Sequence, residues 1–254
     1  MIRRRLWPLL AIWAALTAPA IADVPRDHAG CLAQARQAPE SGYRAAQNWS
    51  QQGGGAMARH CAALALLYLG QSSEAAARLE SLATEAKNPG QAVAWLAQAG
   101  QAWFMARRFA RAETVQSQVL QRAPDNIEFR IDRAVTRLSA GDHWAALDDL
   151  NQVLERDPGH IDAYLFRAAA YRYLDALDLA RDDVERLLAL DPARAEGWLE
   201  RGILRQLQGD LRGARDDLMR AIAKAEDPAV GGAARGPGVV GAGARRGRAP
   251  PTPK

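Results

Sequence analysis

Residues 161–194 read IDAYLFRAAAYRYLDALDLARDDVERLLALDPAR. The proline near the end of this stretch, Pro192, is the last of three that lie 34 residues apart, after Pro124 and Pro158. Each of these prolines follows a hydrophobic run and a short polar step, a place where proline ends one helix and starts the next unit. The spacing therefore predicts a chain built from repeated units of 34 residues.

Other positions recur at the same interval. Small residues fill two of these columns and mostly larger apolar residues fill a third. The columns are Gly100, Ala134, Ala168 and Gly202; Ala112, Ala146, Ala180 and Ala214; and Val119, Val153, Leu187 and Ala221. Small residues at matching places let two helices approach closely, and each helix pair leaves an apolar face that only a neighbouring pair can cover. The stretches 140–142 and 208–210 are expected to be turns, in which Gly ends one helix and Asp caps the next.

This pattern resembles the tetratricopeptide repeat, a helix-turn-helix unit that stacks along the chain. The copy at 161–194 carries Tyr164, Ala168, Tyr171, Ala180, Leu187 and Pro192 at the places that the family favours. The resemblance implies an all-α fold, a right-handed superhelical solenoid of antiparallel helix pairs. Its repeats are expected at 56–89, 93–126, 127–160, 161–194 and 195–228, after an N-terminal helical cap at 23–55 with helices at 28–37 and 41–52.

The N-terminus carries a pattern typical of export. Three arginines at 3–5 precede an apolar run at 6–16, and Ala20-Ile21-Ala22 follows. This arrangement predicts a signal peptide over 1–22 with cleavage after Ala22, so that the mature protein is periplasmic or secreted. A retained membrane anchor is the alternative, although the run is shorter than the roughly 20 residues that a span needs. No other apolar stretch is long enough to predict an integral membrane span.

The C-terminal residues 229–254 consist mainly of Gly, Ala, Arg and Pro and contain no acidic residue. This composition predicts a disordered tail. The chain of 254 residues has 33 Lys and Arg against 29 Asp and Glu. Eight of the basic residues lie in the leader and the tail. Acidic residues therefore outnumber basic ones in the part of the chain that separates these two segments. The repeats are therefore not expected to bind nucleic acid. The tail could instead contact a membrane or nucleic acid. Because no amphipathic pattern follows Glu226 to cap the last apolar face, two further hypotheses are that a partner covers this face or that a shifted reading frame replaced a capping helix.

Arginine and aspartate also follow the 34-residue period. The arginines are Arg133, Arg167 and Arg201, and the aspartates are Asp149, Asp183 and Asp217, each preceded by a second aspartate. Adjacent carboxylates could indicate acid–base chemistry or cation binding. A feature present in every unit is more typical of architecture, so we expect structural ion pairs between the first and second helix of each unit.

The chain has two cysteines, Cys31 and Cys61. In an exported protein an even pair favours a disulfide, which here would tie the cap to the first helix of the next pair. Free buried thiols are one alternative. A metal site that adds His28 and His60 is the other, although adjacent residues on a helix project about 100° apart.

No nucleophile, phosphate-binding, metalloprotease or dinucleotide motif appears, so we expect no enzyme activity, cofactor or metal. The family resemblance implies instead a concave groove, lined by the first helices, that binds a peptide or helix of a partner protein. The expected groove residues are Gln101, Phe104, Met105, Glu128, Ile131, Arg172, Tyr173 and Gln206. We expect a non-catalytic interaction module of the bacterial envelope. The alternative is an accessory subunit of an envelope or cell-wall enzyme complex. The sequence does not indicate the oligomeric state.

Overall fold

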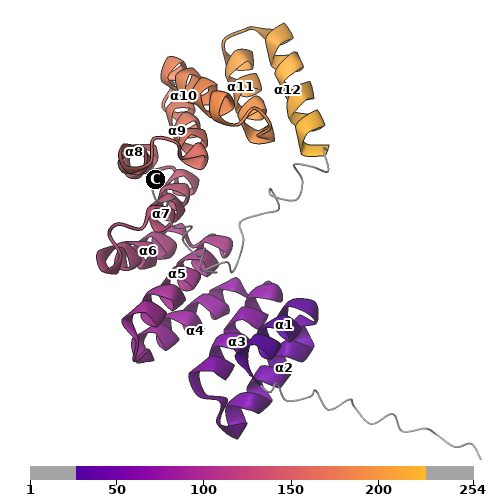
Figure 1. Ribbon diagram of the computed structural model, residues 1–254, viewed down its shortest axis with the longest axis vertical. Helices are drawn as coiled ribbons and strands as arrows, with labels where there is room; N and C mark the ends of the chain where they lie inside the picture. The colour runs from indigo at the N-terminus through magenta and orange to yellow at the C-terminus, as the bar shows by residue number, and fades with distance from the viewer. Residues whose placement is uncertain (1–26, 227–254) are drawn as a thin grey trace, which may run out of the picture.

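The computed structural model describes residues 27–226, and over that range all regular structure is helical (Figure 1). The helices are α1 (His28–Gln37), α2 (Pro39–Trp49), α3 (Gly55–Tyr68), α4 (Ser72–Glu85), α5 (Pro89–Met105), α6 (Phe109–Arg122), α7 (Ile127–Ala140), α8 (His143–Arg156), α9 (Ile161–Tyr173), α10 (Leu177–Leu190), α11 (Ala195–Leu207) and α12 (Leu211–Glu226). A kink at Ser50–Gly54, where Gln52 and Gly53 leave the helical backbone conformation, joins α2 to α3. No helix in the described range combines the length and apolar character needed to cross a bilayer. The expected signal peptide at 1–22 and the tail at 229–254 lie outside the described residues.

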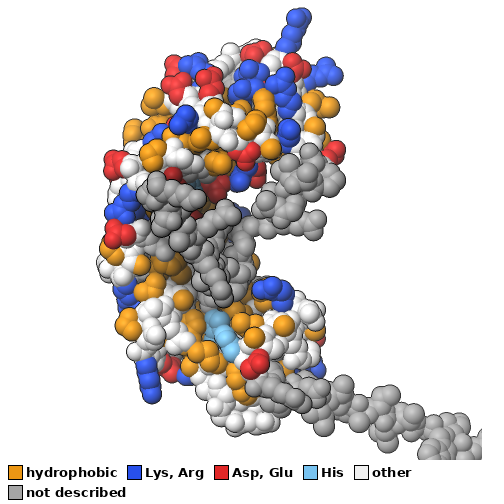
Figure 2. Space-filling view, in the orientation of Figure 1, with side chains coloured by type: hydrophobic (Ala, Val, Ile, Leu, Met, Phe, Trp, Pro, Cys, Tyr) orange, Lys and Arg blue, Asp and Glu red, His pale blue; other side chains and the backbone are white. Residues whose placement is uncertain are grey.

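Successive helix pairs follow a curved path, so that the solenoid bends into an arc (Figure 1). Each helix packs against the next one in the chain, and the first helices of neighbouring units also touch one another. The second helices of neighbouring units make no comparable contacts in the described range, which places the first helices on the inner side of the curve. Figure 2 shows the surface hollowed on one side between the two ends of the arc. The all-α solenoid of antiparallel helix pairs expected from the sequence is confirmed.

The turn inside each repeat contains one residue in the left-handed backbone conformation. These residues are Gly70, Arg107, Gly141, Asp175 and Gly209, and the last four lie 34 residues apart. The two expected Gly-Asp turns are confirmed, because Asp142 accepts a hydrogen bond from the backbone N–H of Ala145 and Asp210 accepts one from Gly213. These caps satisfy donors that the first helical turn leaves unpaired.

The columns of small residues lie where helices approach each other most closely. Ala134, Ala146, Ala168 and Ala180 are completely buried. A β-carbon on Gly100 would lie 2.9 Å from Gln116 Cγ, so the first helix of that unit has no room for a larger residue. Between units, a β-carbon on Gly197 would lie 2.4 Å from Leu187 Cδ2. The close approach of the helices, within and between units, therefore requires small residues at these places.

Two helix boundaries differ in detail from the expected pattern. The three residues inserted before 93 extend α5, which has 17 residues and begins at Pro89 after the capping residue Asn88. Helix α2 begins at Pro39 rather than at 41, because proline is well tolerated in the first turn of a helix. The insertion thus lengthens one helix and leaves the order of the helix pairs unchanged.

Candidate functional site

The recurring arginines and aspartates meet inside each of the last three repeats. Every pair is bidentate, with both nitrogens at 2.7 to 3.0 Å from the carboxylate oxygens, and it joins the first helix to the second helix of the same unit. The pairs are Arg133–Asp149, Arg167–Asp183 and Arg201–Asp217. The three aspartates are at most 5% exposed. Because arginine occupies both carboxylate oxygens, these aspartates are not open acid–base groups.

Two of these arginines also reach the preceding unit. Arg167 Nη1 donates to Asn151 Oδ1 at 2.8 Å, and Arg133 Nη1 donates to Ser117 Oγ at 3.1 Å. The hydrogen bond to Asp183 raises the pKa of Arg167 above its usual value, so the guanidinium stays charged. The recurring arginines therefore connect the two helices of a unit, and they also connect neighbouring units.

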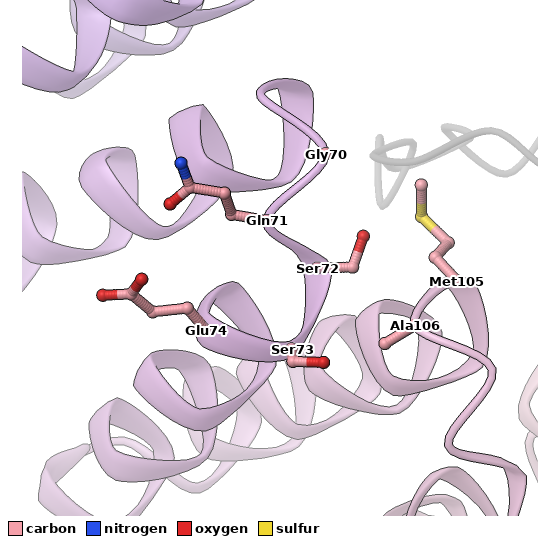
Figure 3. Close-up of a pocket in the computed structure, with 7 residues that line it drawn as sticks. All are labelled: Gly70, Gln71, Ser72, Ser73, Glu74, Met105 and Ala106. Carbon is pink, nitrogen blue, oxygen red and sulfur yellow. The ribbon is translucent and has the colours of Figure 1, made fainter.

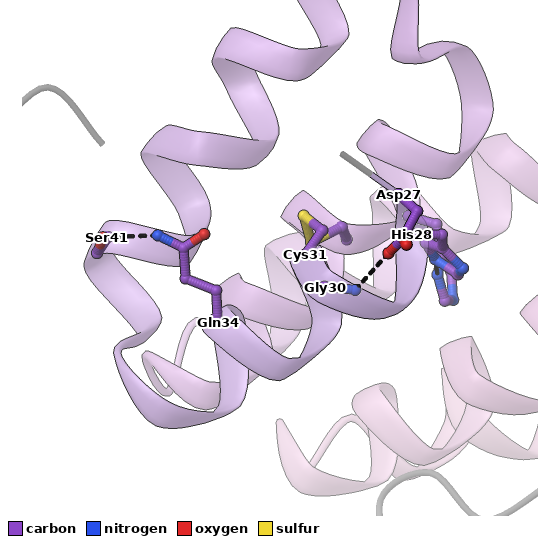
Figure 4. Close-up of a disulfide and its surroundings, with 8 residues drawn as sticks. Asp27, His28, Gly30, Cys31, Gln34 and Ser41 are labelled. Atoms are coloured by element: carbon purple, nitrogen blue, oxygen red, sulfur yellow. Dashed lines mark hydrogen bonds between the residues drawn. A yellow bond between two sulfur atoms is a disulfide. The ribbon is translucent and has the colours of Figure 1, made fainter. Parts of the chain in front are cut away.

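The two cysteines lie side by side at the N-terminal end of the solenoid. The structure joins the sulfurs of Cys31 in α1 and Cys61 in α3, whose Cα atoms are 6.1 Å apart (Figure 4). This separation is within the ordinary range for a disulfide. Both cysteines are completely buried. Gln34 of α1 donates to Ser41 Oγ of α2 at 3.0 Å, so a hydrogen bond also ties α1 to α2.

The two nearby histidines form a chain of hydrogen bonds across three first helices. His28 Nε2 donates to His60 Nδ1 at 2.9 Å, and His60 Nε2 donates to Gln98 Oε1 at 2.7 Å. Burial lowers the pKa of His60 to about 4, and it also lowers the pKa of His28, so both rings are neutral near pH 7. Among the described residues no group of three or more His, Cys, Asp or Glu side chains is placed to hold a metal ion. The histidines therefore link helices.

Most of the polar groove residues are engaged with a neighbouring first helix. Gln101 donates to Asp132 Oδ2 at 3.4 Å, and burial raises the pKa of Asp132 to about 6. Arg172 Nε donates to Glu200 Oε1 at 2.5 Å. Glu128 lies 3.8 Å from His160, and this carboxylate raises the pKa of His160 above its usual value.

The apolar groove residues differ in how much of each side chain reaches the surface. Ile131 is only 7% exposed and packs in the core of its unit, so its expected place on the binding surface is wrong. Phe104 is half-buried beside Phe109. Met105 is 45% exposed and Tyr173 is 61% exposed. Ile131 is buried because it belongs to the core that α7 forms with Leu150 and Val153 of α8 and Ala163 of α9.

Three of the expected groove residues are exposed: Met105 of α5, Tyr173 of α9 and Gln206 of α11. We call these three residues the first-helix surface. The ring of Tyr173 is held rigidly. It stacks on His143 with 4.7 Å between ring centroids, and the Arg172 guanidinium lies 4.5 Å from its centroid. A rigid, exposed aromatic ring offers contact area at low entropic cost.

Comparison with known proteins agrees with this architecture. A family model described as tetratricopeptide repeat matches residues 168–235. This match supports tetratricopeptide repeats in that segment of the chain. A structure of MamA, from residue 41 to its end, from Desulfovibrio magneticus RS-1 is similar, with a TM-score of 0.57 and 22% identity over 66% of this chain and 94% of that one. A tetratricopeptide repeat protein from Parabacteroides merdae ATCC 43184 has a TM-score of 0.61 and 18% identity over 81% of this chain and 82% of that one. At these identities the likeness concerns the fold. No curated protein sequence matches the chain.

The last repeat exposes an apolar face on its second helix, α12. Leu211, Met219 and Ile222 of α12 are each more than half exposed. In the preceding repeat, Leu188 of α10 stands 34 residues before Ile222 and is buried against α11. Because no amphipathic pattern follows Glu226 in the sequence, this is the face that we expect to lack a capping helix.

Proposed function

We propose that this chain is a non-catalytic interaction module of the bacterial envelope, which holds a peptide or helix of a partner protein against its first-helix surface. The tetratricopeptide repeat fold is typical of scaffolds for protein–protein interaction. The observation that carries the proposal is that Met105, Tyr173 and Gln206 of three first helices remain exposed, while Gln101 and Arg172 are engaged with other helices. An extended peptide or amphipathic helix suits such a surface of mixed character.

The envelope location is supported by two features. The leader pattern at 1–22 predicts export, and two fully buried cysteines with sulfurs at bonding distance are typical of proteins that fold in an oxidising compartment. Fractionation of cells that produce the full chain tests this part. We expect the protein in the periplasmic or secreted fraction, shortened by the residues up to Ala22, and recovery of an unshortened chain in the cytoplasm would contradict it.

Affinity capture from an envelope extract tests the surface. The variant Met105→Ser/Tyr173→Ser removes two apolar contacts, and Leu179→Ser is a matched control because Leu179 is 50% exposed on the second helix α10. We expect the wild type and the control to recover the same partner and the double variant to lose it. Equal recovery by all three proteins, or loss in the control alone, would contradict the proposal.

A further inference from the structure

The two ends of the solenoid leave different kinds of surface open. A cavity of about 550 Å³ lies between the start of α4 and the end of α5 (Figure 3). Apart from Met105, the residues that line it are small or polar: Gly70, Gln71, Ser72, Ser73, Glu74, Met105 and Ala106. At the other end of the arc lies α12 with three exposed large apolar side chains (Figure 1). The uncovered apolar surface is therefore at the C-terminal end.

One position of α12 shows what kind of group this surface suits. In three earlier repeats the same position of the second helix holds a polar residue, Ser117, Asn151 or Glu185. Each of these interacts with the recurring arginine of the next unit, 16 residues further along. In α12 the position holds Met219, which is 60% exposed. A further unit with such an arginine would find no acceptor here, so Met219 favours an apolar occupant.

Two charged residues lie beside the apolar ones on the same side of α12. Arg215 is one turn before Met219, and Glu226 is one turn after Ile222. Both charged side chains are exposed, and neither forms an ion pair with another residue of the described range. In the two preceding repeats proline occupies the place of Glu226. The last repeat thus departs from the repeated pattern at both Met219 and Glu226.

The spacing of these four residues is the same in both directions along the helix. From Arg215 to Met219, Ile222 and Glu226 the steps are four, three and four residues, which keep all four on one face. An α-helix rises about 1.5 Å per residue. If two copies of α12 lie antiparallel with Met219 of one beside Ile222 of the other, Arg215 of one is level with Glu226 of the other. The twofold axis makes every pair occur twice.

We propose that α12 pairs with α12 of a second copy of this chain, antiparallel about a twofold axis. Four apolar side chains meet at the centre, and an arginine meets a glutamate at each end. Such a contact is self-complementary and closes with two copies. A parallel pair would instead bring like charges together, which is unfavourable. The pairing uses neither Met105 nor Tyr173, so it is independent of the proposed function.

The neighbouring helix α11 widens the surface. Leu199 is 45% exposed, whereas Ile131, which stands in the same column two repeats earlier, is 7% exposed and packs against the next unit. A standard interface buries about 800 Å² on each partner. One face of a helix of 16 residues supplies less than this, so we expect a dimer that dissociates on dilution.

Sedimentation velocity of the full chain over a range of concentrations tests the pairing. We expect the mean mass to rise from that of one chain to that of two. The variant Met219→Ser/Ile222→Ser should stay monomeric, because the dimer loses all four central side chains. Leu179→Ser/Leu190→Ser is the matched control, with both changes at exposed positions of α10, and it should dimerise like the wild type. Melting temperatures check that both variants fold.

Charge reversal tests the antiparallel register. Arg215→Glu brings two carboxylates together at each end of the pair, and Glu226→Arg brings two guanidinium groups together. Each variant alone should therefore associate about tenfold more weakly. An equimolar mixture of the two should recover the wild-type strength as a mixed dimer, which native mass spectrometry identifies, because opposite charges meet again at both ends. Arg186→Glu, at an exposed position of α10, is the control and should associate like the wild type.

A wild type that stays monomeric at every concentration would overturn the proposal, as would a Met219→Ser/Ile222→Ser variant that dimerises at the wild-type strength. A mixture that associates no better than its two components would overturn the antiparallel register. If the chain is monomeric and Met219→Ser/Ile222→Ser speeds hydrogen exchange in α12, the cover comes from the same chain. A monomer without that change assigns the face to a different protein, which also contradicts the pairing.

Discussion

The N-terminal and C-terminal parts of this solenoid are held together by different chemistry. From α7 to α12 each repeat contains a buried Arg–Asp pair. In the repeat formed by α5 and α6, Ala99 and Val115 stand at the equivalent places, both completely buried. Helices α1 and α3 are joined instead by the two cysteine sulfurs and by the hydrogen bond between His28 and His60. Contacts within a helix pair can thus be ionic or apolar, whereas the sulfur contact joins the first helices of two neighbouring pairs.

This difference shows that the fold specifies the size and spacing of side chains more strictly than their polarity. A buried ion pair needs both partners, because one charge left alone is strongly unfavourable, whereas an apolar pair of suitable size has no such requirement. The N-terminal part also carries the cavity beside Met105, and the C-terminal part carries the rigid ring of Tyr173. Each part can therefore be perturbed by its own substitutions.

Replacing Arg167 by Leu should cause the largest loss of stability. Asp183 is only 5% exposed, and Arg167 is the one basic side chain in the described range that pairs with it. Removal of the arginine leaves this carboxylate buried and unpaired, at a cost of about 4 kcal/mol. Denaturation by urea, followed by circular dichroism, measures the change.

The matched variant is Arg133→Leu. Its aspartate, Asp149, keeps a second arginine, because Arg137 Nη1 lies 2.8 Å from Asp149 Oδ2. The loss should therefore be clearly smaller than for Arg167→Leu. Equal losses would show that the number of arginine partners does not decide the stability of these repeats.

Replacing both cysteines by Ala should lower the free energy of unfolding by about 3 kcal/mol. A disulfide between residues 30 apart in sequence restricts the unfolded chain, and the variant loses this restriction. Denaturation of the wild type with and without a thiol reductant measures the same effect, and mass spectrometry before and after reduction identifies the bond. If the reductant changes neither the mass nor the stability, the cysteines are free thiols.

Acidification should weaken the N-terminal part through His60. Burial lowers the pKa of His60 in the folded chain to about 4, below its ordinary value of 6.5. Its neutral form therefore contributes stability that is complete above pH 6.5 and is lost as the pH falls toward 4, in total about 3 kcal/mol. Stability measured across this pH range should fall less steeply in His60→Gln.

One buried acid opposes this trend. Burial raises the pKa of Asp132 to about 6 from 3.8, so its carboxylate destabilises the folded chain at neutral pH and less so as the pH falls. The variant Asp132→Asn removes this opposing contribution. The loss of stability on acidification should then be steeper than in the wild type, and a shallower loss would contradict the assignment.

The smallest effect is expected when one repeat is given the apolar pair of another. The variant Arg167→Ala/Asp183→Val has the residue types that Ala99 and Val115 provide in the repeat formed by α5 and α6. No charge is left buried, so the loss should be about 1 kcal/mol or less. A loss as large as that of Arg167→Leu alone would show that the ion pair itself is required.

Periodicity explains how much of this structure could be predicted. The 34-residue spacing brings Arg167 and Asp183 to facing places on two helices, and it sets the turns at Gly141 and Gly209. It does not determine which first-helix side chains pack in the core between neighbouring units, so the expected surface position of Ile131 is wrong.

Hydrogen exchange, measured helix by helix on the full chain, tests most directly whether the two parts depend on separate contacts. We predict that a thiol reductant increases exchange in α1, α2 and α3 and leaves α9 to α12 unchanged. We predict that Arg167→Leu has the reverse effect, with faster exchange in α9 and α10. An equal increase across all described helices after either change would contradict this account.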